Sequence, residues 1–142
     1  METSDIRRRL RLALEQAKKA SAERRARADA AAAAFDAFLR DVATPVFKVV
    51  GNVLKAEGHA FSVFTPAGTV RLVSDRSGDD FVELWLDVSI DPPQVGTRVN
   101  RVRGRNVTTL EGQLRPQAPI KSLTEEDVVA FLLSQIGALV ER

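Results

Sequence analysis

The 142-residue sequence contains no cysteine and no tyrosine, and its single histidine is His59. The absence of cysteine excludes disulfide bonds, thiolate metal ligands and cysteine nucleophiles. A catalytic triad would have to use His59, and no serine motif marks a partner for it. The glycines are scattered and form no phosphate-binding loop. We therefore assign no catalytic residue, no metal ligand and no cofactor, and we expect a non-enzymatic protein.

Long apolar runs are also missing, because no stretch approaches the roughly 18 residues that a membrane span requires. The arginines near the start are followed by only a short apolar stretch, and Glu2, Asp5 and Glu15 argue against a transit peptide. We expect no membrane association and a cytoplasmic location. The composition is otherwise ordinary for a globular domain, with 44% hydrophobic and 28% charged residues.

Glycine and proline are both absent from residues 3–42, where alanine dominates and arginine, lysine, glutamate and leucine stand between the alanines. These are strong helix formers, so the segment predicts one long helix capped by Thr3, Ser4 or Asp5. One seam of this helix has the 3–4 spacing of a coiled coil, with large apolar residues at its ends and polar interruptions in its middle. Its apolar members are Leu10, Leu14, Ala17, Ala28, Ala31, Phe35, Phe38 and Val42.

Such a helix has little to bury within a small chain, which points to assembly. We predict that residues 1–43 form an oligomerisation arm that pairs with a second copy, most simply as a dimer, or with a helical partner protein. The alternative is a solvated helix that docks only its last turns, from Phe35 to Val42, on the rest of the chain. Residues 44–142 are then a single domain.

Within that domain the pattern predicts an α+β fold: a short second helix, an antiparallel meander of four to five strands, and a C-terminal helix packed on one sheet face. Thr44 is interpreted as the cap of the second helix, with Pro45 in its first turn. Thr124 and Asp127 form a capping box for the last helix. The expected strands are residues 60–65, 69–74, 81–90, 97–103 and 107–114.

The strand at 81–90 alternates between aliphatic and polar or aromatic residues, so its aliphatic side faces the core. A three-residue turn in the first hairpin predicts Phe64 opposite Val70. In the second hairpin, the expected pairs are Val70 with Leu86 and Leu72 with Leu84. The opposite sheet face is expected to carry apolar residues among its charges, and it therefore calls for a cover. Those residues are Phe61, Val63, Val73 and Trp85.

The later arginines Arg101, Arg103 and Arg105 alternate, so a strand would display them on one face about 6–7 Å apart. This spacing suits successive phosphates, but the aromatic platform of single-strand binders is missing. We favour a structural interpretation, in which these arginines make ion pairs and a cation–π contact with the neighbouring strand. The predicted pairs are Arg101 with Asp87, Arg103 with Trp85, and Arg105 with Glu83.

Three hypotheses for function follow. The first is a non-enzymatic self-associating protein-interaction module that uses the first helix and the sheet face around Trp85. The second is association with nucleic acid, through the strand arginines and a basic run near the start that consists of Arg7, Arg8, Arg9 and Arg11. The third is a small-ligand binder or enzyme that uses the Trp85 face, which requires a concave pocket there.

Overall fold

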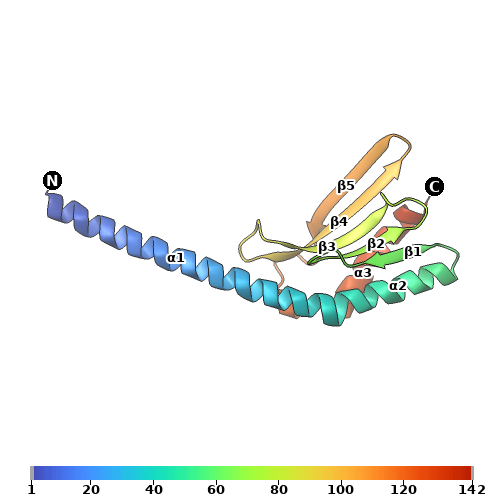
Figure 1. Cartoon of the computed structure of the whole chain (residues 1–142), viewed down its shortest axis with the longest axis horizontal. Coiled ribbons are helices and arrows are strands. Elements are labelled where there is room, and N and C mark those ends of the chain that lie inside the picture. The colour runs from blue at the N-terminus through green and yellow to red at the C-terminus, as the bar shows by residue number, and fades with distance from the viewer. Residues whose placement is uncertain (1, 142) are drawn as a thin grey trace.

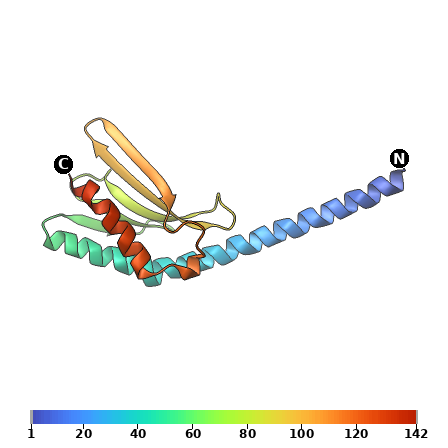
Figure 2. The ribbon, with the colours of Figure 1, turned by 180° about the vertical axis from the view of Figure 1, so that it is seen from behind.

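A long N-terminal helical rod joins a five-stranded sheet in the computed structural model, which describes residues 2–141 (Figure 1). The rod consists of α1 (Thr3–Phe38), a π-helical turn η1 (Leu39–Ala43) and α2 (Thr44–Ala56). At about 1.5 Å per residue, the 36 residues of α1 extend roughly 54 Å. The N-terminal part of α1 projects away from all the other elements (Figures 1 and 2).

The sheet is an antiparallel meander in the order β1-β2-β3-β4-β5, followed by a short 3-10 turn and the C-terminal helix. The predicted α+β class and the meander are therefore confirmed. The elements are β1 (Phe61–Phe64), β2 (Val70–Ser74), β3 (Phe81–Asp87), β4 (Gln94–Arg103), β5 (Asn106–Gln113), η2 (Ile120–Ser122) and α3 (Glu125–Val140).

The predicted break between the first two helices is wrong. Thr44 has helical dihedral angles, with φ −62° and ψ −45°, and its N–H donates to the carbonyl of Leu39. Pro45 lacks an N–H and its ring crowds the carbonyl four residues earlier, which normally ends or kinks a helix. The π turn lets the rod continue, because its wider spacing inserts one residue just before the proline.

The helix ends differ in how well their caps were predicted. Glu2 is the N-cap of α1 and makes no side-chain cap hydrogen bond, so the predicted cap is wrong there. Asp5 instead pairs with Arg8 inside the helix. The capping box of α3 is confirmed: Thr124 Oγ1 accepts from the Asp127 N–H, and the Asp127 carboxylate accepts from the Thr124 N–H.

The first hairpin is shifted by one residue from the predicted register. Phe64 pairs with Arg71 rather than Val70, and Val63 pairs with Leu72. A one-residue slip moves every side chain of a strand to the other face. Phe61 and Val63 therefore lie on the core side of the sheet, and the outer face is less apolar than predicted.

The second hairpin is shifted by two residues, since Val70 pairs with Leu84 and Leu72 with Val82. An even shift preserves the face, so the aliphatic residues still share the core side as predicted. Asp87 ends β3 early, because its carboxylate accepts hydrogen bonds from the N–H and the hydroxyl of Ser89.

This early turn changes the pairing of β3 with β4. Glu83 pairs with Arg98 and Trp85 with Gly96, so the predicted partners Arg101, Arg103 and Arg105 are wrong. The strand also begins earlier than expected, directly after the proline pair of the loop.

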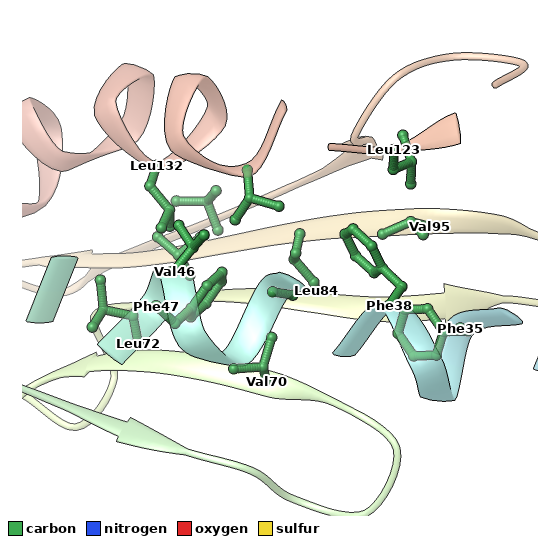
Figure 3. Close-up of a cluster of buried hydrophobic side chains, with 14 of the residues drawn as sticks. Phe35, Phe38, Val46, Phe47, Val70, Leu72, Leu84, Val95, Leu123 and Leu132 are labelled. Carbon is green, nitrogen blue, oxygen red and sulfur yellow. The ribbon is translucent and has the colours of Figure 1, made fainter. Parts of the chain in front are cut away.

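The core lies between the sheet and a layer formed by α2 and α3 (Figure 3). Phe47 is fully buried there, beside the aliphatic residues of β2 and β3. Phe35 and Phe38 extend the core toward Val95 and Leu123. The last turns of α1, from Arg27 onward, therefore contact the body of the same chain, and the part of α1 before Arg27 projects from it.

Candidate interaction surfaces

The free segment of α1, residues 3–24, exposes large aliphatic side chains. All residues from Ile6 to Lys19 are exposed, and Leu10 and Leu14 retain 56% and 53% of their accessible surface. Leu12 is 53% exposed but lies outside the coiled-coil seam. Isolated exposed leucines are common, whereas an aliphatic seam along a projecting helix has the spacing that partner helices use.

The same seam becomes buried toward the end of α1. Ala17 is exposed, Ala28 and Ala31 are half-buried, and Phe35 and Phe38 are only 2% and 5% exposed. The two phenylalanines therefore belong to the core of their own chain and leave the set of predicted oligomerisation residues. One continuous helix face thus serves two purposes: it contacts the body at one end and is open at the other.

The N-terminal arginines lie on this free segment, far from the sheet. Arg7, Arg8, Arg9 and Arg11 are all exposed, and both Arg8 and Arg9 form ion pairs with Asp5, at 2.6 and 3.4 Å. Figure 1 shows that the start of α1 and the sheet are at opposite ends of the molecule. The two basic stretches therefore do not form one surface.

The strand arginines separate into different environments. Arg103 is anchored by the Asp80 carboxylate at 3.0 Å and by the carbonyl of Ala138, so it joins β4 to α3. Arg101 is half-buried, and Arg105 is exposed in the turn after Gly104. The predicted row of three equivalent arginines is thus not formed.

Asp80 is a buried anchor that the sequence pattern did not reveal. Its side chain is fully buried, and it accepts hydrogen bonds from the Val102 N–H at 2.7 Å and from Arg103. Within residues 2–141, no group of three or more histidine or acidic side chains is placed to hold a metal ion.

A charge ladder crosses the outer face of the sheet. Glu83 is 2% exposed and accepts from Arg71 Nε at 2.7 Å and from Arg98 Nη1 at 2.8 Å. Arg98 also donates to Glu111 on β5 at 3.1 Å. The expected kinds of contact, an ion pair with Glu83 and a cation–π contact, are therefore present, but Arg98 makes them.

The two arginines also cover the aromatic rings of this face. The guanidinium of Arg98 lies 4.7 Å from the Trp85 ring centroid, and that of Arg71 lies 4.1 Å from the Phe81 centroid. Such contacts contribute about 0.5–1 kcal/mol where partly exposed. Arginine side chains of the sheet itself thus cover the aromatic rings of its outer face, and Trp85 is less accessible to a partner than predicted.

Trp85 also depends on Gly96 in the next strand. A Cβ at position 96 would lie 2.6 Å from the indole Nε1, so only glycine admits the ring in this position. The Nε1 atom is buried and has no hydrogen-bond partner in the structure. The indole is therefore fixed by packing and by Arg98 rather than by hydrogen bonding.

A bidentate ion pair joins α1 to the β3–β4 loop. Arg27 Nε and Nη2 donate to the two carboxylate oxygens of Asp91, at 2.9 and 2.8 Å. This hydrogen bonding lowers the pKa of Asp91 below its ordinary value of 3.8 and raises that of Arg27. The pair marks the point beyond which α1 leaves the body.

Two shallow grooves lie beside this junction. One, of about 470 Å³, is lined by alanines of α1 together with Ile120, Lys121 and Leu123. Another, of about 560 Å³, lies between the β3–β4 loop and Gln117. Neither is lined by Trp85, so neither supplies the pocket that the third hypothesis requires there.

No helix in residues 2–141 combines the length and apolar character needed to cross a membrane. Comparison with known proteins adds no functional assignment: no family model matches the chain, and neither a curated protein nor a solved structure shows significant similarity to it.

Proposed function

We propose that this chain is a non-enzymatic self-associating protein-interaction module, in which the free segment of α1 pairs with the same segment of a second copy. The observation that carries the proposal is the open end of the seam. Leu10 and Leu14, the large seam residues at this end, are 56% and 53% exposed on a helix that projects from the body. Burying one such side chain contributes about 1.5–3 kcal/mol.

The position of the body favours an antiparallel pair. Because the body lies on the seam face from about Ala28 to Phe38, a partner helix on that face has room only along the free segment. In a parallel pair, both bodies would compete for the space between the helices. In an antiparallel pair, the bodies lie at opposite ends and the two free segments overlap.

The charged residues that flank the seam determine how salt should affect self-association. Arg11, Lys18 and Arg25 follow each other at seven-residue intervals beside the seam. In an antiparallel pair, these basic flanks face each other, and salt screens their repulsion. Self-association is therefore expected to strengthen with salt, whereas nucleic-acid binding by these arginines would weaken.

The test is the mass of the full chain in solution by light scattering, over a concentration series at low and high salt. Leu14→Glu should weaken self-association at least tenfold, because an apolar contact of about 1.5 kcal/mol or more is lost. Leu12→Glu is the matched control, since Leu12 is equally exposed but lies off the seam. A wild-type monomer at all concentrations, or equal effects of the two variants, would contradict the proposal.

A further inference from the structure

The two edges of the sheet differ in how well they are protected. The β1 edge is four residues long, whereas β5 has eight residues, of which Asn106 to Gly112 are all exposed. Natural edge strands are usually short or carry lysine, proline or a bulge that prevents pairing. β5 has no lysine or proline, and Glu111 is its one charged residue.

The backbone of β5 offers a regular row of hydrogen-bonding groups to solvent. The Leu114 N–H donates to Val95 on β4, and Asn106 pairs with Arg103 at the turn. In an antiparallel ladder, alternate residues bond to opposite neighbours, so the even-numbered residues bond to β4. The N–H and C=O groups of Val107, Thr109 and Glu111 therefore point away from the sheet.

We propose that β5 is a homodimerisation edge, which pairs antiparallel with β5 of a second copy about a two-fold axis at Thr108. This register places Val107 opposite Thr109 of the second copy, with outward-facing backbone groups on both. It joins the two sheets into one. The contact does not use α1, so it goes beyond the pairing of free segments proposed above.

Charge selects this register. On the outer face, four neighbouring strands each contribute one charged side chain to a row across the sheet. The charges alternate in sign from strand to strand, and the residues are Arg71, Glu83, Arg98 and Glu111. The row therefore ends at the β5 edge with an acidic side chain. When Thr108 lies opposite Thr108 of the second copy, Glu111 lies opposite Arg105 of the second copy.

The two-fold axis forms this pair of Arg105 and Glu111 twice. Opposite charges across strands stabilise a pair, and like charges destabilise it. A register with Glu111 opposite Glu111 would place two acids together. The exposed Arg105 at the hairpin tip, whose predicted partner Glu83 lies two strands away, thus has a partner in the dimer.

The absence of cysteine allows a direct test by cross-linking in the full chain. Thr108 would occupy a non-hydrogen-bonded position, where opposing Cα atoms lie about 4.5 Å apart, within the range of a disulfide. Thr108→Cys should therefore form a disulfide-linked dimer under mild oxidation. Thr109→Cys is the matched control, because in this register its two copies are offset by two residues and lie too far apart.

Charge variants in the Thr108→Cys background test the register. Arg105→Glu should slow cross-linking about tenfold, because two ion pairs become two repulsions. Glu111→Arg should do the same, and the double variant should restore the rate. Cross-linking of Thr108→Cys no faster than Thr109→Cys, or no rescue by the double variant, would overturn the proposal.

The variant Leu14→Glu, which changes the seam of α1, tests whether the β5 contact is independent of the α1 pairing. Leu14→Glu should leave the Thr108→Cys cross-linking rate unchanged, even where it lowers the solution mass. If Leu14→Glu abolished the cross-link, the β5 contact would depend on α1 and the independent edge would be refuted.

Discussion

Glu83 offers the sharpest test of how the outer sheet face is stabilised. It is 2% exposed and bridges Arg71 and Arg98, whose side chains remain 33% and 29% exposed. In Glu83→Gln the side chain keeps its shape but loses its charge. Two guanidinium groups then lie on adjacent sides of a neutral amide that can satisfy only one of them well.

The loss of stability expected for Glu83→Gln follows from how deeply the ion pairs of Glu83 are buried. Removing one partner of a buried ion pair typically costs about 3–5 kcal/mol. Because about a third of each arginine remains accessible, water replaces part of what is lost, and we expect a cost of about 2 kcal/mol. For a chain of this size, that lowers the melting temperature by roughly 6–8 °C.

Urea unfolding followed by the fluorescence of Trp85, the single tryptophan, measures this cost directly. The matched control is Glu111→Gln, which removes a carboxylate that pairs with Arg98 but is 55% exposed. That variant should cost less than about 1 kcal/mol. If Glu83→Gln is no more destabilising than Glu111→Gln, the buried ladder does not stabilise this face, and the reasoning fails.

Two further predictions concern local contacts. Gly96→Ala should displace the indole, because the new Cβ would lie 2.6 Å from Nε1. Trp85 emission should then shift to longer wavelength, and the free energy of unfolding measured in urea should fall by about 1–3 kcal/mol. The control Gly137→Ala has free space around its new Cβ and should not destabilise the fold. The pKa of Asp91 is lowered in the fold, so its ion pair with Arg27 stabilises above pH 3.8 and is lost as the pH falls through the lowered value. The urea midpoints of wild type and Asp91→Asn should thus differ at neutral pH and draw together as the pH falls below 3.8, and a difference that does not shrink there would contradict this assignment.

Much of the fold was accessible from residue patterns because those patterns report local chemistry. The alternation of Val82, Leu84 and Leu86 correctly assigned the core face of β3, since side chains in a strand alternate whatever the register. The capping box of Thr124 and Asp127 likewise depends on residues three positions apart. Such features involve no distant partner, and the structure confirms them.

The wrong predictions of strand register and of a helix break arise where distant contacts or turn geometry determine the local structure. A turn that begins at Asp87 moved the β3–β4 register and exchanged the predicted arginine partners for Arg98. The helix continues through Pro45, because burial of Phe38 before the π turn and of Phe47 after it holds both sides of that turn on the body. For the candidate site, the seam spacing identified a helix face, but only tertiary structure shows which part of that face is free.

The two proposed contacts together predict how the chain assembles. Both are two-fold contacts between identical surfaces, and they lie on different elements, α1 and β5. A chain with two such contacts links beyond a dimer, into closed tetramers or open rows. Light scattering should therefore show wild-type masses above the dimer at high concentration, dimers for Leu14→Glu and for Arg105→Glu, and monomers when both changes are combined. If either single variant is already monomeric, one contact alone accounts for assembly, and the other proposal is wrong.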